Sequence, residues 1–235
     1  MSRVTAVIVT YNSGAHLAEA VASCERFGVP VVIVDNASTD GTIFPPGVTT
    51  LRNEANRGFA AAVNQGVRAH AAPLTLLLNP DARLLTGIEP LCDISVASRH
   101  TAATGLLVQA DGSPQKGFSI RRLPTPASLA FEVLGINQLW PRNPVNRAYR
   151  CADVDLSRRQ SVEQPAGALC LFRRDDWEEL GGFDERFFPV WFEDVDFAKR
   201  LLDRGGTIVL DPTVRAAHAG GHSVEKLADS SRIRF

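Results

Sequence analysis

The sequence predicts an α/β fold with a mostly parallel central sheet, and two patterns carry that prediction. Short runs of valine, isoleucine and leucine recur through the first third of the chain, as is typical of strands buried on both faces of a parallel sheet. The segments between them space their apolar residues along one face of a helix. The alternation predicts strand–helix–strand units whose right-handed crossovers bring the carboxyl ends of the strands to one edge, where ligands bind.

The first part of the chain contains the most regular elements. Strands are expected at residues 4–10, 31–34, 48–51 and 74–78. A first helix is expected around residues 17–24 and a second from Phe59 to Val67, with Asn56 placed to cap it. Each of the long strands is followed by polar turn residues, and these turns are expected at the same edge of the sheet.

The second part of the chain is less regular. We expect a strand at 102–108, a loop at 111–126 and a helix at 128–139, whereas 141–155 fits no pattern. Further on we expect a strand at 167–172, a short helix, a longer helix from Glu193 to about Arg204 and a last strand at 207–210. The longer helix has acidic residues at its start and basic residues near its end, which suits the helix dipole. No repeat or linker divides the sequence, so one domain over residues 1–235 is expected.

Composition and charge exclude several classes of protein. The 235 residues are 45% hydrophobic and 22% charged, as in ordinary globular chains. With 25 basic and 26 acidic residues the net charge is −1, which argues against a general nucleic-acid binder. The four cysteines form no C-x-x-C pair, so a zinc ribbon is not supported. No apolar run is long enough to span a bilayer and no signal peptide is recognised, so we expect a cytoplasmic protein.

Basic pairs such as Arg121–Arg122 and Arg158–Arg159 stand out against this balanced charge. The simplest interpretation is a solvated surface. The alternative is a local contact with an anionic acceptor or with a membrane surface.

Four polar clusters follow predicted strands or begin a predicted helix. They are Thr10–Tyr11–Asn12, Asp35 to Gly41, Asn79–Pro80–Asp81 and Glu193–Asp194. Any one of them is explained by turn formation alone, because Asn, Asp and Gly favour turns. The first three are separated by single crossovers and are therefore expected to be neighbours at one sheet edge.

The same segments, in the same order, resemble family 2 glycosyltransferases. The resemblance rests on Val7–Asn12, Val34–Thr42, Asn56–Phe59 with Asn64–Gly66, Leu77–Asp81, Gly181–Glu185 and Phe192–Asp196. It covers about residues 4 to 223 and is nearest to bacterial rhamnosyltransferases of surface-polysaccharide synthesis. The resemblance implies a GT-A fold, which is Rossmann-like, and an inverting transfer of a sugar from a nucleotide-sugar.

This resemblance assigns the donor site to the first half of the chain. Asp35 is expected to accept a hydrogen bond from the imide N–H of a uracil or thymine, so the donor is a dTDP- or UDP-sugar and rhamnose is one candidate sugar. The other donor-site residues implied are Thr10, Tyr11, Asn12, Asn36, Asp40, Arg57, Gly58, Asn64 and Asn79. Residues 1–100 are then the nucleotide-binding half, and residues 101–235 the acceptor and catalytic-base half.

A divalent cation, Mg²⁺ or Mn²⁺, is implied at the slot of the family's D-x-D motif. Here that slot reads Asn79–Pro80–Asp81, which leaves Asp81 as its one carboxylate. Oxygen ligands suit either cation. His218 resembles the family's distal histidine and completes the implied metal site, while His222 and Ser223 are implied near the diphosphate.

The acceptor hydroxyl must lose a proton as it attacks the anomeric carbon, and a carboxylate within reach can accept it. By its motif position Asp194 is the implied base and Glu193 its orienting partner. Trp191 is expected in the acceptor subsite, because sugars present C–H faces that pack on aromatic rings. The irregular segment from Gly112 to Arg150 is expected to face the acceptor.

Two other functions remain open at this point. One is a catalytically inactive nucleotide-sugar binding module or partner subunit, which the Asn79 departure allows. The other is a sugar nucleotidyltransferase, which a basic phosphate loop would favour and Thr10–Tyr11–Asn12–Ser13 does not provide. The acceptor is expected to be a glycan or a lipid-linked sugar, and a homodimer and peripheral contact with the inner membrane face are left open.

Overall fold

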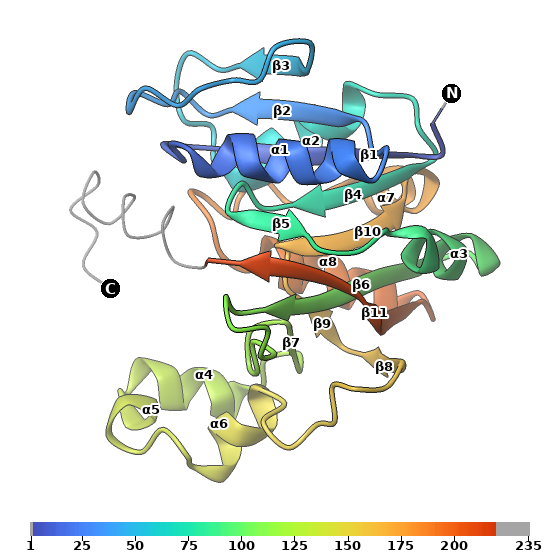
Figure 1. Ribbon diagram of the computed structural model, residues 1–235. Helices are drawn as coiled ribbons and strands as arrows, with labels where there is room; N and C mark the ends of the chain where they lie inside the picture. The colour runs from blue at the N-terminus through green and yellow to red at the C-terminus, as the bar shows by residue number, and fades with distance from the viewer. Residues whose placement is uncertain (1, 220–235) are drawn as a thin grey trace.

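In the computed structural model the described residues, 2–219, form a twisted sheet covered by helices on both faces (Figure 1). The nine-stranded sheet has the order β3-β2-β1-β4-β10-β6-β11-β5, with β8 paired to β11. A second sheet pairs β7 with β9. The strands are β1 Val4–Thr10, β2 Val31–Asp35, β3 Thr49–Arg52, β4 Leu74–Leu78, β5 Ala82–Leu84, β6 Thr101–Val108, β7 Ile120–Arg121, β8 Gln160–Val162, β9 Gln164–Pro165, β10 Leu169–Arg173 and β11 Thr207–His218.

Strand direction decides which segments meet at the carboxyl edge. β1 runs parallel to β2 and β4, and β6 runs parallel to β11. β10 is antiparallel to both β4 and β6, so the two parallel sets point the same way. The ends of β1, β2, β4, β6 and β11 therefore share one edge, and the end of β10 lies at the opposite edge.

Helices lie on both faces of the sheet, and three more lie apart from those layers, beyond β7. They are α1 His16–Arg26, α2 Phe59–Arg68, α3 Glu89–Ala97, α4 Pro126–Val133, α5 Ile136–Leu139, α6 Pro144–Tyr149, α7 Arg174–Leu180 and α8 Glu193–Asp203. One core cluster joins α1 and α3 to one face of the sheet, and a second joins α2, α7 and α8 to the other. The α2 packing is so close that a Cβ at Gly66 would lie 2.4 Å from Val7 Cγ1.

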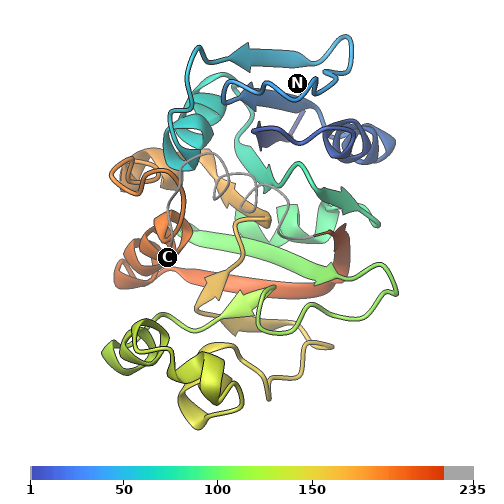
Figure 2. The same ribbon diagram turned by 90° about the vertical axis from the view of Figure 1, so that its left-hand side faces the viewer.

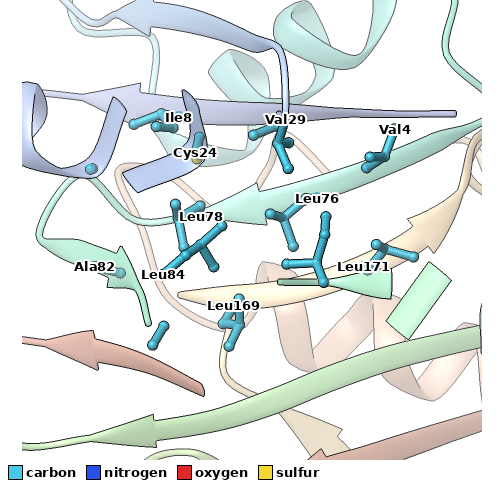
Figure 3. Close-up of a cluster of buried hydrophobic side chains, with 14 of the residues drawn as sticks. Val4, Ile8, Cys24, Val29, Leu76, Leu78, Ala82, Leu84, Leu169 and Leu171 are labelled. Atoms are coloured by element: carbon cyan, nitrogen blue, oxygen red, sulfur yellow. The ribbon is translucent and has the colours of Figure 1, made fainter. Parts of the chain in front are cut away.

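The first core cluster is built from alternate side chains of neighbouring strands (Figure 3). Ile8, Leu76, Leu78 and Leu169 are fully buried there. Burial of this kind contributes about 2 kcal/mol for each large side chain. In β1, β2, β4 and β6 the strand interiors contain only apolar residues, glycine and threonine.

The expected elements of the sheet are largely confirmed. The strands at 4–10 and 74–78 coincide with β1 and β4, and α8 begins at Glu193 as expected. The second helix differs in its cap: Gly58 holds the N-cap position, and Asn56 Oδ1 accepts a hydrogen bond from Gly58 N at 2.9 Å instead. The last strand was expected to end at 210, but β11 passes through a register shift after Leu210 and continues to His218.

The middle of the chain departs most from expectation. The loop expected at 111–126 contains β7, and the helix expected at 128–139 is two helices, α4 and α5, separated by Gly135 with φ 69°. The unassigned segment 141–155 contains α6. We call residues 122–153 the helical lobe. It stands at the end of the sheet beyond β7 and on the side to which β1 and β2 point (Figures 1 and 2).

Candidate active site

A cavity of about 410 Å³ opens at the carboxyl edge of the sheet. It lies where β1, β2, β4 and β11 end and where α8 begins. The expected site residues that line it are Tyr11, Asn36, Asn79, Asp81, Trp191, Glu193, Asp194 and His218. Segments more than 200 residues apart in the sequence are therefore brought to one space, as the parallel topology predicts.

Asp81 and His218 form a contact pair in the cavity wall. His218 Nε2 lies 3.3 Å from Asp81 Oδ1, and both side chains are buried. Gln115 fixes the imidazole: its Nε2 donates to the His218 carbonyl at 2.6 Å, and its Oε1 lies 3.0 Å from His218 Nδ1. Because that oxygen can only accept, Nδ1 carries a proton, and Nε2 is the ring nitrogen that faces the Asp81 carboxylate.

Asp194 lies at the start of α8 with its carboxylate in the cavity wall. Its Oδ1 accepts a hydrogen bond from Val195 N at 2.8 Å and its Oδ2 accepts one from Gly167 N at 3.2 Å. Burial raises the pKa of Asp194, while the two N–H donors and the Arg121 guanidinium oppose that rise. These donors stabilise the ionised form that a general base needs.

Glu193 has a different environment from its neighbour. It is 4% exposed, and among the described residues none donates a hydrogen bond to its Oε2. Burial, followed by the nearby charge of Asp194, raises the pKa of Glu193 to about 8. A pKa of about 8 keeps Glu193 protonated at neutral pH, which agrees with the tendency of two adjacent buried carboxylates to avoid double ionisation.

The backbone before α8 is held in a rare conformation. Trp191 has φ 98° and Phe192 has φ 72°, both in the left-handed region that side chains seldom adopt. Both rings line the cavity, and Trp191 remains 47% exposed. The bend is anchored to α2, since Phe59 N donates to Pro189 O at 2.8 Å. Trp191 thus lines the same cavity as Asp194, and its expected contact with an acceptor sugar stays a prediction.

Several expected donor-site side chains lie behind the cavity wall instead of lining it. Thr10 Oγ1 donates to Ser13 Oγ, and Asn12 Oδ1 accepts from Thr39 N at 2.7 Å. Asp40 accepts from Gly14 N at 3.1 Å. These contacts stabilise the two polar turns that follow β1 and β2, so the nucleotide contacts expected of them stay predictions.

Asp35 is also engaged by the protein. Its Oδ1 accepts from Ser38 N at 3.0 Å, and its Oδ2 pairs with Arg52 Nε at 3.2 Å. Neighbouring Asn36 does reach the cavity, and it donates through Nδ2 to Gly58 O at 3.1 Å. A hydrogen bond from the nucleobase to Asp35, as expected from the sequence, would therefore need a carboxylate lone pair that these two contacts do not use.

Arg57, Gly58 and Asn64 are not among the residues that line the cavity. Arg57 is exposed, and Gly58 packs so closely on the Phe188 ring that a Cβ would lie 2.9 Å from it. Asn64 bonds to both the N–H and the carbonyl of Phe183, each at 2.9 Å. Asn64 thus joins α2 to the segment before α8. Because its amide is used in these bonds, its geometry does not favour direct contact with the nucleotide-sugar. His222 and Ser223 lie outside the described residues.

The cavity also contains residues that the sequence did not single out for chemistry. They are Phe118, Arg121, Tyr149 and Gln164. Phe118 stacks on the His218 ring with centroids 4.9 Å apart, and Arg121 is the one guanidinium among the described cavity residues. Three of the four fall in the segment 112–150 that was expected to face the acceptor, and of these only Arg121 was named beforehand, as part of a basic pair.

A second cluster of possible metal ligands, His100, Asp176 and Glu179, lies elsewhere. His100 precedes β6 and the two acids belong to α7, which follows the antiparallel β10, so the cluster is at the opposite edge. Guanidinium groups already balance it: Arg99 lies 2.9 Å from Glu179, and Arg173 lies 3.8 Å from Asp176. We interpret it as an ion-pair network between α7 and the start of β6.

Comparison with known sequences leads to sugar-transferring enzymes. The family profile described as Glycosyl transferase family 2 matches residues 5–127, and the one described as N-terminal domain of galactosyltransferase matches residues 147–219. A Mycobacterium tuberculosis protein named N-acetylglucosaminyl-diphospho-decaprenol L-rhamnosyltransferase is 34% identical over 239 aligned positions. The alignment covers 92% of this chain and 76% of the relative.

Comparison with solved structures leads to the same fold. GalNAc-T7 with UDP, GalNAc and Mn²⁺ superposes with a TM-score of 0.70 at 17% identity, over 92% of this chain and 42% of that one. The mannosyltransferase PcManGT of Pyrobaculum calidifontis, in complex with GDP-Man and Mn²⁺, gives 0.60 at 21% identity, over 99% and 65%. This chain therefore spans less than two thirds of either structure.

Sequence and fold together define a glycosyltransferase of the GT-A class, the class to which the sheet and its carboxyl-edge cavity correspond. More closely, the chain belongs to glycosyl transferase family 2, and its sequence is similar to a mycobacterial rhamnosyltransferase. The expected fold class, family and enzyme class are thereby confirmed, in preference to a nucleotidyltransferase or an inactive module. None of the helices in residues 2–219 is both long and apolar enough to cross a bilayer.

Proposed function

We propose that this enzyme transfers a sugar from a nucleoside-diphosphate donor to the hydroxyl of a lipid-linked acceptor, by a single displacement with Asp194 as base. The observation that carries the proposal is the arrangement of two carboxylate sites in one cavity. Asp81 with His218 lies on the sheet side, and Asp194 lies at the start of α8. One site suits the leaving diphosphate and the other suits the attacking hydroxyl.

The name of the mycobacterial relative supports the substrate classes. That protein transfers rhamnose to N-acetylglucosaminyl-diphospho-decaprenol, as its name states. We assign this chain a rhamnose donor, linked to dTDP or UDP, and a polyprenyl-diphosphate sugar acceptor on that basis. The first hundred residues then bind the donor, and the remainder supply the base and the acceptor site.

The donor set fits a divalent cation. His218 Nε2 and the Asp81 carboxylate oxygen lie 3.3 Å apart in the cavity wall, close enough for both to bind one cation. Asp81, His218 and the amide oxygen of Asn79 would hold Mg²⁺ or Mn²⁺. When bound, such an ion stabilises the charge that builds on the departing nucleoside diphosphate. The Mn²⁺ in both solved neighbours favours manganese.

The chemical step follows from the placement of Asp194. The acceptor oxygen forms a bond to the anomeric carbon from the face opposite the diphosphate, and Asp194 accepts the hydroxyl proton. The bond between the anomeric carbon and the phosphate oxygen breaks, and its electron pair leaves with the diphosphate. One displacement of this kind inverts the anomeric configuration. Protonated Glu193 preserves a single negative charge beside the reacting hydroxyl.

The proposal is tested by a transfer assay with a panel of donors. The enzyme is incubated with dTDP-rhamnose, UDP-sugars and GDP-mannose, with a polyprenyl-diphospho-N-acetylglucosamine acceptor and either Mn²⁺ or a chelator. We expect metal-dependent transfer from the rhamnose donor and a product whose anomeric configuration, read by NMR, is opposite to that of the donor. Retention of configuration, or full activity in the chelator, would contradict the mechanism.

A further inference from the structure

The helical lobe exposes apolar side chains that a globular surface normally buries. Five large ones are exposed along α4, α5 and the residues that follow them: Leu129 42%, Val133 86%, Leu134 71%, Leu139 89% and Trp140 57%. Single exposed apolar residues are common, but a group on adjacent short helices indicates an interaction surface.

The inside of the lobe is polar, so these side chains do not form a core of their own. In α4 the one buried residue is Ser128, and in α6 it is Asn146. Asn143, fully buried, donates to Asn137 Oδ1 and to Trp140 O, each at 2.8 Å. The lobe is therefore held together by amide hydrogen bonds while its leucine and tryptophan side chains point outward.

The helical lobe carries a net positive charge. It contains four basic and two acidic residues, in a chain whose net charge is −1, and its Arg147 pairs with Asp153 at 2.5 Å. The basic residues are Arg122, Arg142, Arg147 and Arg150, and the acidic ones are Glu132 and Asp153. Apolar side chains flanked by arginine are the combination that binds the surface of an anionic bilayer.

The position of the lobe connects this surface to the cavity. Arg121, directly before the lobe, and Tyr149, within it, both line the cavity, and Arg122 N bonds to Tyr149 O at 2.9 Å. The lobe also stands on the side of the sheet to which β1 and β2 point (Figure 1), and residues next to the ends of those strands line the cavity. A surface lying against the lobe would thus lie beside the cavity mouth.

We propose that the helical lobe is a docking surface for an anionic lipid bilayer, with Val133, Leu134, Leu139 and Trp140 inserting among the acyl chains. A second copy of this chain is disfavoured as the occupant, because a two-fold interface would bring the same arginine-rich surface of each copy together. The surface itself does not depend on which sugar is transferred. Its use in presenting a lipid-linked acceptor rests on the proposed function.

The test is co-sedimentation of the full chain with vesicles of phosphatidylcholine alone or mixed with phosphatidylglycerol. We expect binding to the mixed vesicles that weakens as salt is raised. The double variant Val133→Asp/Leu139→Asp should bind about tenfold more weakly or worse, and Arg142→Gln about fivefold more weakly. Folding is preserved in the double variant, since both positions are more than four-fifths exposed.

Val96→Asp serves as the matched control, because Val96 is 45% exposed on α3, the helix that leads into the amino end of β6. It should bind vesicles as the unmodified chain does. Equal binding by the double variant and the unmodified chain would overturn the proposal. So would a dimer, seen by light scattering, that the double variant alone dissociates. Vesicle binding does not require transfer, so its failure is distinct from failure of the proposed function.

Discussion

The central sheet and the helical lobe place their apolar side chains in opposite ways. In β1, β2 and β4 every residue is buried, and helices cover both faces. In α4 and α5 one residue in total is buried, and it is a serine. The sheet gains its stability by removing apolar surface from water. The lobe leaves that surface available and relies on hydrogen bonds between asparagines.

This difference separates two tasks of the enzyme. A close-packed sheet fixes the cavity residues to one another, because buried side chains have no room to shift. A lobe with little apolar interior is free to adapt to what it touches, at a cost in local stability. The site is accordingly built on the sheet and α8, and the lobe borders its entrance.

The sharpest test of the comparison is the loss of one leucine from each region. Leu76 is fully buried in β4, whereas Leu139 is 89% exposed. Leu76→Ala should lower the free energy of unfolding by about 2–5 kcal/mol, and Leu139→Ala should change it by less than about 0.5 kcal/mol. Urea denaturation measures both. Similar losses would mean that the lobe has an apolar core after all.

A second test concerns Glu193, a buried carboxyl group in the α8 layer. The pKa of Glu193 is raised from 4.5 to about 8 in the folded protein, so between these values the folded state holds a proton that the unfolded state has lost. Stability should then fall as pH rises through this window, by about 1.4 kcal/mol per pH unit. Glu193→Gln should remove that slope.

Thermal unfolding at pH 5 and pH 8 makes this measurement. The variant is expected to match the unmodified chain at pH 5 and to exceed it in melting temperature at pH 8. Glu54→Gln, at an exposed position, is the control and should follow the unmodified chain throughout. If the melting temperatures of all three proteins changed equally between pH 5 and pH 8, Glu193 would not have a raised pKa.

Gln115 lies on the segment that joins the sheet to the lobe, and it tests how the two regions are coupled. Gln115→Met removes the amide that fixes the His218 imidazole. Manganese affinity in the presence of a nucleoside diphosphate should fall about 10- to 100-fold. Calorimetric titration measures this affinity without any sugar transfer. Gln109→Met, in the same loop, is the control and should leave the affinity unchanged. An unchanged affinity would remove His218 from the proposed metal site.

The smallest expected effect is confined to the lobe. Asn143 is the N-cap of α6, and its side chain accepts from Asn146 N at 2.8 Å. Asn143→Ala should cost about 1 kcal/mol. Hydrogen exchange should become faster in α4 to α6 and stay unchanged in β1 and β4. Faster exchange in the sheet strands would show that the two regions unfold together.

The sequence predicts the sheet well because its strands carry a local signal. Runs such as Val31–Asp35 are apolar on both faces and end in turn residues, so neither bounds nor burial depend on distant contacts. The lobe gives no such signal: exposed Leu134 and Leu139 look like core residues in the sequence, while buried Asn143 and Asn146 look like loop residues. Hydrophobic periodicity therefore does not predict the structure of the lobe, because apolar residues are exposed there and polar residues are buried.

The site shows the same division. Asp81, Asp194 and His218 follow from motif positions and all reach the cavity. Gln115 could not be found this way, because its partner His218 is 103 residues away and its loop has no regular pattern. The antiparallel direction of β10 was equally invisible, since an apolar run does not record which way a strand points.

The central claim is that Asp194 accepts the proton of the acceptor, and one comparison of variants tests it most directly. Asp194→Asn is compared with Asp196→Asn, two residues along α8, where the carboxylate pairs with Arg200 instead of lining the cavity. Donor binding, measured by calorimetry, should be retained in both. The account predicts that kcat falls about 10²- to 10⁴-fold for Asp194→Asn and stays close to normal for Asp196→Asn. Equal transfer rates for the two variants would contradict it.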